Sequence, residues 1–328
     1  MSYDAVSYDA AAAALSGATS IIITTHINPD GDGIGSGLAL LLALDRPGRR
    51  VRFLCPSRVA SLYAFLPRFA ELTPVTDDAQ AAEAEACEVM ISCDAGDRER
   101  LGSVAKVRHT TLINLDHHVT NTRFGNINLV DETAESSGVV VEGLLRRLGV
   151  AVDRTIAECL YTTIVFDTGR FMHSNTTAHT FRWTADLLET GIDASEINRR
   201  LTYTRSPKDL AILKLGIECL AIDDDPRLAG IVIPAASIAA VGEPEDWGDL
   251  VEIPRSLAGN RVAYLMRESK DGKSVRVSLR SNPPIEIGSV AQAFGGGGHA
   301  FAAGCTVVKP LAEAVADVRA RLRRQLGQ

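Results

Sequence analysis

The chain has 328 residues, of which 46% are hydrophobic and 23% are charged, and its formal net charge at pH 7 is −7. This length exceeds the usual size of one compact domain and predicts two domains, each able to bury its own core. The acidic balance argues against wrapping long duplex nucleic acid, which needs many cations on one face, and the longest apolar run, residues 38–44, is far too short to span a membrane.

Four apolar segments in the first part of the chain each end on an Asp or a His. They cover residues 21–26, 89–94, 111–116 and 164–167. Unbroken apolar runs are typical of strands in a parallel sheet that is covered on both faces, and helical patterns over 35–44, 136–148 and 177–188 alternate with them. The sequence therefore predicts an α/β domain built on a parallel sheet.

The polar residues at these four predicted strand ends are expected to converge. In an open α/β sheet the ligand site lies outside the carboxyl ends of the strands. A single Asp after a strand is more often a turn former or a helix cap. Four such ends, two of them with histidines, favour a shared site instead.

The pattern loosens after Gly191 and then resumes in a different form. We expect a first domain over 1–192, a linker with a connecting helix over 193–220, and a smaller α/β domain over 221–328. Strands of this second domain are predicted at 228–234, 261–267 and 274–279, followed by a glycine run at 295–298 and a last helix from Leu311.

The segment after the first strand carries an imidazole and two carboxylates within seven residues, at His26, Asp30 and Asp32. Hard divalent cations prefer such oxygen ligands, and an imidazole beside them suits Mn²⁺ better than Ca²⁺. Pro29 and the glycines at 31, 33, 35 and 37 are expected to bend this segment into a loop. No G-x-G-x-x-G spacing is present, which disfavours a dinucleotide cofactor.

Three further motifs follow the segment from His26 to Asp32 along the chain. Asp94 ends the second predicted strand, the tripeptide Asp116-His117-His118 follows the third, and Asp167 ends the fourth. Taken in this order, the motifs of the first domain resemble the DHH phosphoesterase superfamily. The C-terminal segment Phe294-Gly-Gly-Gly-Gly-His-Ala-Phe-Ala-Ala-Gly resembles the DHHA1 accessory domain of the branch that contains bacterial nanoRNases, enzymes that also dephosphorylate 3′-phosphoadenosine 5′-phosphate. The resemblance spans nearly the whole chain.

The resemblance implies two divalent cations, expected to be Mn²⁺, and assigns a role to each site residue. His26, Asp30 and Asp94 would bind one metal. The second metal would be bound by Asp32, Asp94, His117 and Asp167, so that Asp94 bridges, while Asp116 supports the site and His118 faces the phosphate. Four carboxylates match the charge of two divalent cations, so a metal-free site is expected to be strained by repulsion and to be stabilised by metal.

Substrate contacts are expected mainly from the second domain, with the active site in the cleft between the domains. Glycine amides can approach an anion without obstruction by side chains. The candidates are Arg280, Ser281, Asn282, Gly296, Gly297, Gly298 and His299, together with Arg98 of the first domain, which could equally be an exposed side chain. His109, His173 and His179 are expected not to be ligands.

The sequence thus predicts an Mn²⁺-dependent enzyme that degrades short RNA oligonucleotides to nucleoside 5′-monophosphates and dephosphorylates 3′-phosphoadenosine 5′-phosphate. A linear or cyclic dinucleotide phosphodiesterase stays open. An inorganic pyrophosphatase, a RecJ-like single-strand exonuclease and a non-catalytic nucleotide sensor are less favoured. The six cysteines form no CxxC pair and predict buried thiols. We expect a cytoplasmic protein, and association into a homodimer is left open.

Overall fold

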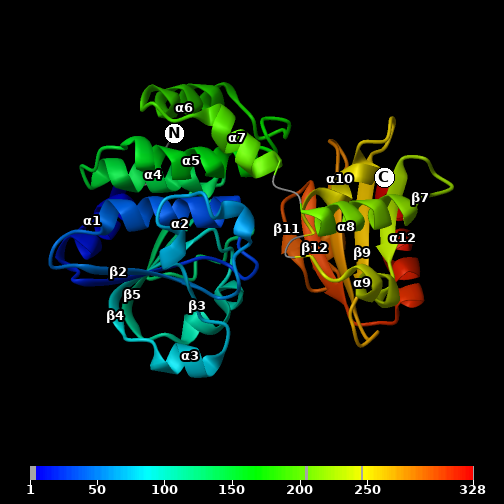
Figure 1. Ribbon diagram of the computed structural model, residues 1–328, viewed down its shortest axis with the longest axis horizontal. Helices are drawn as coiled ribbons and strands as arrows, with labels where there is room; N and C mark the ends of the chain where they lie inside the picture. The colour runs from blue at the N-terminus through cyan, green and yellow to red at the C-terminus, as the bar shows by residue number, and fades with distance from the viewer. Residues whose placement is uncertain (1–4, 204–205, 245–246, 328) are drawn as a thin grey trace. The chain divides into compact units, whose positions relative to one another are not determined.

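The computed structural model describes residues 5–203, 206–244 and 247–327. The chain divides into two compact units, Met1–Thr204 and Arg205–Gln328 (Figure 1). The linker predicted over 193–220 includes residues 204 and 205, which lie outside the described ranges. Most of this segment is helical, because helix α7 (Ala194–Thr202) closes the first unit and helix α8 (Pro207–Glu218) packs Ile212 into a core of the second.

The first unit is built on a six-stranded sheet in the order β3-β2-β1-β4-β5-β6, and every pairing in it is parallel. The strand order reverses between β1 and β4, which is where ligands bind in sheets of this class. The prediction of a parallel α/β domain is therefore confirmed. The strands are β1 (Ser20–Thr24), β2 (Arg50–Cys55), β3 (Thr73–Pro74), β4 (Cys87–Cys93), β5 (His109–Asp116) and β6 (Ile127–Val130).

Helices cover both faces of this sheet (Figure 1). Ile21 and Ile23 of β1 point into the larger core, and Ile22 between them points into the smaller core on the opposite face. A continuous apolar strand is the expected result of burial on both faces. On the larger-core face lie α1 (Ala5–Gly17), α2 (Gly31–Leu44), α4 (Ser137–Arg147) and α5 (Arg154–Asp167), with α6 (Ala178–Glu189) beyond them; α3 (Asp78–Glu83) and the 3₁₀ segment η3 (Glu99–Lys106) lie on the other.

The strand predicted over 164–167 is wrong, because these residues form the last turn of helix α5. The helix begins after Asp153, whose side chain accepts a hydrogen bond from the amide of Ile156. Its residues from Cys159 to Val165 are all buried, and Ile164, Val165 and Phe166 form a short apolar run just before Asp167. A run of this kind cannot be assigned to a strand or to a buried helix by periodicity alone.

The glycine-rich loop predicted after Asp30 is also wrong, because helix α2 already begins at Gly31. The glycines lie inside the helix and allow other segments to approach it closely. A Cβ atom on Gly35 would lie 2.6 Å from the backbone oxygen of Cys159 in α5, and one on Gly33 would lie 2.1 Å from the hydroxyl of Thr25. These glycines therefore serve packing around the site.

The second unit is built on a six-stranded mixed sheet in the order β11-β12-β10-β9-β8-β7, in which only β8 and β9 pair in parallel. The predicted strands at 228–234, 261–267 and 274–279 and the helix from Leu311 are confirmed. The strands are β7 (Leu220–Ile222), β8 (Leu228–Ile233), β9 (Val262–Glu268), β10 (Val275–Ser281), β11 (Gly297–Gly298) and β12 (Ala302–Val307).

Helices flank this sheet on both faces as well. One core contains buried residues of α11 (Gly288–Gln292) and α12 (Leu311–Leu326), and the other contains residues of α8, α9 (Ala235–Val241) and the segment that leads through η4 (Gly248–Val251) into α10 (Glu252–Arg255). The second domain is therefore α/β, as predicted.

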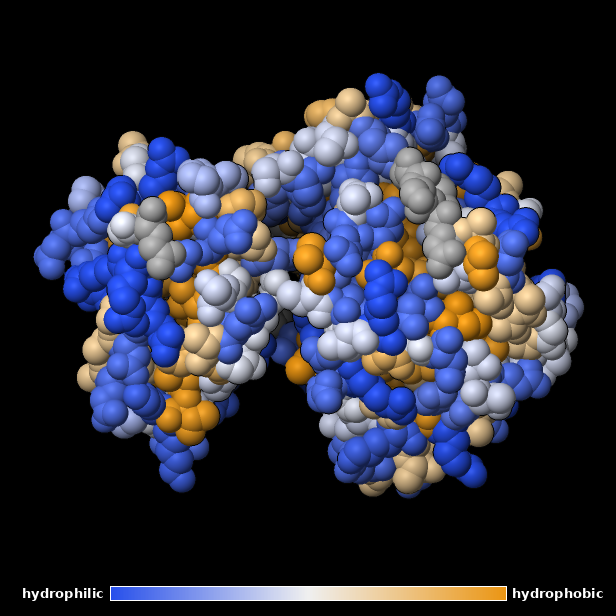
Figure 2. Space-filling model, turned by 180° about the vertical axis from the view of Figure 1, so that it is seen from behind, coloured by the Kyte–Doolittle hydropathy of each residue, from blue (hydrophilic) through white to orange (hydrophobic). Residues whose placement is uncertain are grey.

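Over the described residues, no helix combines the length and the apolar character that crossing a bilayer requires. In the view of Figure 2, hydrophobic residues form small patches separated by hydrophilic ones. All six cysteines are free thiols, and all but Cys219 are buried, which confirms the prediction of buried thiols.

Candidate metal centre

The ends of five elements bring the predicted metal ligands together in the first unit. His26 and Asp94 follow strands β1 and β4 on either side of the point where the strand order reverses. Asp30 and Asp32 begin helix α2, His117 follows β5, and Asp167 ends α5. Three groups of potential ligand atoms result, each with its atoms within 4.8 Å of one another: His26, Asp30 and Asp94; Asp32, His117 and Asp167; and Asp94, Asp116 and His118.

The first group is arranged around the Nε2 atom of His26. This atom lies 3.3 Å from Oδ2 of Asp94 and 3.6 Å from Oδ2 of Asp30. Nδ1 of the same ring donates to the carbonyl of Ile27 at 2.9 Å, which orients Nε2 towards the carboxylates. Nε2 is buried and forms no hydrogen bond with any described residue. A buried ring nitrogen that faces two carboxylates without a hydrogen bond fits a metal cation at this position.

The second group is arranged around the Nε2 atom of His117. It lies 3.0 Å from Oδ2 of Asp167, 3.6 Å from Oδ2 of Asp32 and 3.7 Å from Oδ1 of Asp94. Nδ1 of His117 donates to the carbonyl of Ala134 at 3.1 Å. The two oxygens of Asp94 therefore face different imidazoles, which is the arrangement that a bridging ligand requires.

The side chain of Asp30 faces His26 and is also the N-cap of helix α2. Oδ1 accepts hydrogen bonds from the amides of Asp32 at 3.0 Å and Gly33 at 3.2 Å, while Oδ2 faces His26. The helix cap thus uses one oxygen of Asp30 and leaves the other for the predicted ligand role.

The start of helix α4 holds Asp32, and sequence reasoning missed this contact. Oδ2 of Asp32 accepts from the amide of Ser137 at 2.7 Å, and Oδ1 accepts from the amide of Gly138 at 3.2 Å. The hydroxyl of Ser137 donates to Oδ1 of Asp94 at 3.1 Å. Amides at a helix N-terminus favour an anion. The signal in the sequence was the pair of serines followed by glycine at the start of a predicted helix.

His118 is oriented by Asp116. Nδ1 of His118 lies 2.7 Å from Oδ1 of Asp116 and 3.6 Å from Oδ1 of Asp94. The other oxygen of Asp116 accepts from the side-chain amide of Asn121, which also donates to the carbonyl of Ala95 at 3.1 Å. Asn121 is a further residue that the sequence did not single out, because it follows the tripeptide in an irregular loop.

Protonation in the metal-free site reflects an excess of negative charge. Burial, together with the charges of Asp94 and Asp167, raises the pKa of Asp32 well above its usual range. Burial lowers the pKa of His26, but the carboxylates of Asp30 and Asp94 outweigh it and raise this pKa to about 10. The pKa of His117 is raised for the same reason, against its burial. Protons thus occupy positions where cations would neutralise the carboxylates.

Two arginines near the site differ in their surroundings. Arg98 is exposed, and its guanidinium donates to the carbonyl of Ala105 at 3.2 Å. Arg100 is half-buried, and its carbonyl accepts from the amide of Ile27 at 2.7 Å. Burial and the Asp30 and Asp94 carboxylates have the larger effects on the pKa of His26. The positive charge of Arg100 has a smaller effect and lowers this pKa. Of these two arginines, Arg100 is therefore the one whose charge acts on His26.

The candidate substrate residues at the end of β10 make contacts within the second unit. The guanidinium of Arg280 donates to the carbonyl of Leu279 at 3.0 Å, and its Nε lies 3.4 Å from a carboxylate oxygen of Glu252. Ser281 is fully buried and donates to the carbonyl of Ile285 at 2.6 Å. Asn282 accepts from Arg255 at 3.1 Å. The Ser281 hydroxyl would have to break this hydrogen bond to donate one to a substrate.

The glycine run forms the edge of the second sheet. A Cβ on Gly296 would lie 2.1 Å from the carbonyl oxygen of Gly304, and Gly298 has a φ of +134°, so both positions require glycine. Gly297 faces open space, and the amide of His299 donates to the carbonyl of Ala302 at 2.7 Å. Because Arg280 pairs in register with Ala302, the end of β10 lies beside the turn that carries His299.

Comparison with known proteins gives matches over both units. Residues 20–164 match the model of the DHH family, N-terminal domain, and residues 235–328 match that of the DHHA1 domain. The chain is 32% identical over 288 residues to a bifunctional oligoribonuclease and PAP phosphatase of Thermus thermophilus, covering 88% of this chain and 84% of the relative. It is 27% identical over 296 residues to the protein of the same description in Bacillus subtilis, covering 88% and 89%.

A solved structure has the same fold as this chain. The crystal structure of an exopolyphosphatase-related protein from Bacteroides fragilis superposes with a TM-score of 0.85 at 24% identity, over 98% of this chain and 96% of that one.

Proposed function

Because the chain belongs to the DHH phosphoesterase family and is a hydrolase of phosphodiester and phosphate bonds, we propose that it degrades short RNA oligonucleotides to nucleoside 5′-monophosphates. We further propose that it removes a phosphate from 3′-phosphoadenosine 5′-phosphate. The observation that carries this proposal is the 32% identity, over most of both chains, to a relative described as a bifunctional oligoribonuclease and PAP phosphatase. The gathered ligand atoms of the first unit support it.

Divalent metals are the cofactors of DHH phosphoesterases, and the described residues offer suitable ligand groups. We propose Mn²⁺ as the ion, because imidazole nitrogens accompany the carboxylates. His26, Asp30 and Asp94 would hold one ion, and Asp32, Asp94, His117 and Asp167 the other. When bound, such a pair supplies a water of lowered pKa and neutralises charge on the phosphate.

The remaining chemistry belongs to side chains of this chain. Asp94, whose two oxygens face His26 and His117, fixes the relative positions of the two ligand groups. Asp116 accepts from Nδ1 of His118 and thereby turns the other ring nitrogen away from itself. In our proposal this Nε2 donates to a phosphate oxygen or to the leaving oxygen, as a general acid does.

In this proposal the second unit selects the substrate. The nucleotide would be bound by the side chains of Arg280, Asn282 and His299 and by the amides of Gly296, Gly297 and Gly298. Ser281 would hold the turn that carries Asn282. Contact of one substrate with both units stays a prediction from the sequence, as do a contact from Arg98 and a homodimer.

We also propose a cytoplasmic location, since unpaired, buried cysteines suit a reducing compartment.

A substrate panel tests the function. The protein is incubated with Mn²⁺, Mg²⁺ or a chelator and with an RNA dinucleotide, a five-mer, a 24-mer, 3′-phosphoadenosine 5′-phosphate, cyclic dinucleotides and pyrophosphate, and products are identified by mass. We expect nucleoside 5′-monophosphates from the dinucleotide and the five-mer, AMP and phosphate from 3′-phosphoadenosine 5′-phosphate, and little cleavage of the 24-mer. Turnover confined to dinucleotides would favour the dinucleotide phosphodiesterase instead, and turnover of pyrophosphate alone would contradict the proposal.

A further inference from the structure

One short segment of the first unit, residues 134–138, contacts three of the six metal-ligand candidates; we call it the ligand-holding segment. The carbonyl of Ala134 accepts from Nδ1 of His117 at 3.1 Å. The amide of Ser137 donates to Asp32 at 2.7 Å, and its hydroxyl donates to Asp94 at 3.1 Å. Any shift of this segment therefore changes ligands of both groups.

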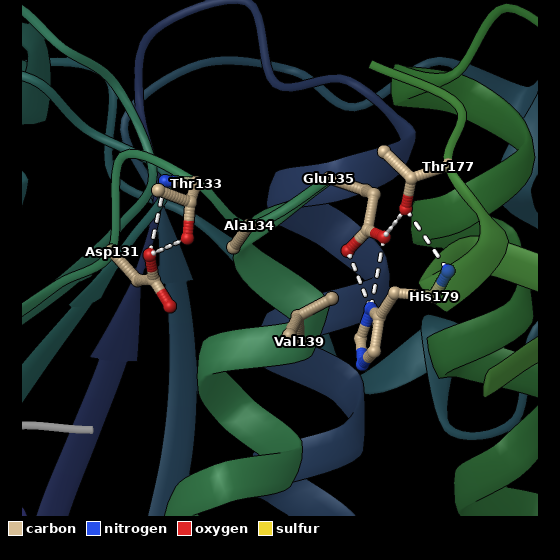
Figure 3. Close-up of a pocket in the computed structure, with 7 residues that line it drawn as sticks. All are labelled: Asp131, Thr133, Ala134, Glu135, Val139, Thr177 and His179. Carbon is tan, nitrogen blue, oxygen red and sulfur yellow. Dashed lines mark hydrogen bonds and ion pairs between the residues drawn. The ribbon is translucent and has the colours of Figure 1, made fainter. Parts of the chain in front are cut away.

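Glu135 lies in the middle of the ligand-holding segment, and its carboxylate is buried and bonded to the start of helix α6. The residue is 3% exposed. One carboxylate oxygen accepts from the hydroxyls of Thr177 at 3.0 Å and Thr180 at 2.8 Å, and Nδ1 of His179 lies 2.9 and 3.1 Å from the two oxygens. Figure 3 shows the carboxylate between Thr177 and His179.

A second connection joins the same two regions through the backbone. The side-chain amide of Asn175 donates to the carbonyl of Glu135 at 3.1 Å and to the carbonyl of Asp167 at 3.2 Å. Asp167 is a ligand candidate as well, in addition to the three that the ligand-holding segment contacts. The start of α6 is therefore tied to segments that carry or contact His117, Asp32, Asp94 and Asp167.

Helix capping alone does not account for Glu135. Helix α6 is already capped by Thr177, whose hydroxyl accepts from the amides of His179 and Thr180, and Thr180 in turn bonds the amide of Thr177. Three side-chain donors around one buried carboxylate exceed what the helix start needs. A buried charge bonded in this way fixes the backbone that carries it, because breaking any bond leaves the charge poorly solvated.

From this geometry we propose that Glu135, bonded to His179, is a positioning residue that sets the affinity of the site for divalent cations through the ligand-holding segment. Partners that orient metal ligands typically change metal affinity by about 10–100-fold when they are removed. The inference rests on the metal-binding part of the proposed function and is independent of the substrate.

Metal binding by variants tests it directly. Glu135→Gln removes the charge, and His179→Ala removes its histidine donor, while His179→Asn keeps an N–H donor near the position of Nδ1. Glu132→Gln is the matched control, because Glu132 lies in the same loop with its side chain 48% exposed. Glu135, Thr177 and His179 border a pocket of about 240 Å³, so space beside the altered groups is available to water. Mn²⁺ affinity is measured by electron paramagnetic resonance, and the Tm of each metal-free variant by circular dichroism.

We expect Glu135→Gln and His179→Ala to weaken Mn²⁺ binding by about 10–100-fold, His179→Asn to restore most of the affinity, and Glu132→Gln to bind as the wild type does. Wild-type affinity in folded Glu135→Gln and His179→Ala overturns the proposal. An equal loss in Glu132→Gln, or a loss that follows the Tm of the metal-free variants without rescue by His179→Asn, overturns it too. If Glu135→Gln does not fold, the Mn²⁺ affinities of His179→Ala and His179→Asn test the proposal instead. Failure of the wild type to bind Mn²⁺ would instead refute the proposed metal site.

Discussion

Asp94 is the residue on which the geometry of the site depends most. It follows β4 with a φ of +59°, in the left-handed region that L-residues rarely adopt, and its oxygens face His26 and His117 while it accepts from Ser137. Asp tolerates this backbone better than most side chains, yet such positions persist mainly where the surroundings enforce them. The turn therefore serves to place one carboxylate between two ligand groups.

Asp94→Asn tests this role, because Asn keeps the shape and also tolerates a left-handed φ. Hydrolysis should fall by more than about 100-fold, beyond the loss typical of residues that only orient ligands. Mn²⁺ should raise the Tm less than in the wild type. Turnover and Tm with and without Mn²⁺ measure these effects; full activity in this variant would contradict a bridging role.

The pH dependence of the metal-free protein should follow His26. Its pKa is raised to about 10 in the folded state, with burial opposing the Asp30 and Asp94 carboxylates, against an ordinary value of 6.5. Because this pKa is raised in the folded state, protonated His26 stabilises the folded protein. This stabilisation is complete below pH 6.5 and is lost as the pH rises through 10. In a chelator, the Tm should therefore fall between these pH values, and the fall should be smaller in His26→Gln.

Metal binding should change in the opposite sense over the same pH window. The proton on His26 must leave before the nitrogen can act as a ligand, so Mn²⁺ affinity should rise by up to about tenfold per pH unit for each proton displaced. Titrations at pH 6.5, 7.5 and 8.5 measure this slope. A pH-independent affinity would show that His26 is not a ligand.

At the scale of elements, the packing of α2 against α5 places Asp30 and Asp32 opposite Asp167. Gly31 and Gly35 of α2 face α5, where added Cβ atoms would lie 2.9 Å from Phe166 and 2.6 Å from the backbone oxygen of Cys159. Close approach of the two helices therefore depends on the missing side chains, since backbone atoms cannot move aside as a flexible side chain can.

Gly35→Ala should destabilise the protein although Ala favours a helix by about 1 kcal/mol over Gly. The added methyl would overpack the contact with Cys159, which typically costs about 1–3 kcal/mol, and displacing α5 would move Asp167 and weaken Mn²⁺ binding. Gly17→Ala is the control, because Gly17 ends α1 and a Cβ there meets nothing within 4 Å. Denaturant unfolding and Mn²⁺ titration of both variants check this; equal stabilisation of both would contradict the packing argument.

At the scale of the whole molecule, the two units hold different parts of the proposed function. All six metal-ligand candidates belong to Met1–Thr204, and Arg280 and His299 belong to Arg205–Gln328. Since each unit has its own sheet and cores, substitutions at the end of β10 or in the glycine turn are expected to leave the metal site intact.

Arg280→Ala and His299→Ala should therefore raise the KM for a short RNA by tenfold or more, in line with the loss of a charge-assisted hydrogen bond of about 1.5–3 kcal/mol, without changing Mn²⁺ affinity. Arg276→Ala is the matched control, because Arg276 is exposed on the same strand. Steady-state kinetics and Mn²⁺ titration separate the two effects. An unchanged KM in both variants would remove the second unit from substrate binding.

The sequence by itself determined the three central strands of each sheet and the identity of the metal-ligand candidates. Strand ends at His26, Asp94 and Asp116 could be located because continuous apolar runs between polar residues mark buried parallel strands. The acidic segment after β1 supplied candidate ligands by its chemistry, and the resemblance to the DHH superfamily assigned roles to the Asp-His-His tripeptide.

Tertiary structure decided what depends on contacts between distant segments. Whether residues 164–167 form a strand or a helix, and whether the glycines after Asp30 serve a loop or a helix contact, depended on the packing of α2 against α5. The contacts of Ser137 with Asp32 and of Glu135 with His179 join residues 105 and 44 positions apart. No local pattern encodes such pairs, because a hydrogen bond between distant segments exists only once the chain has folded.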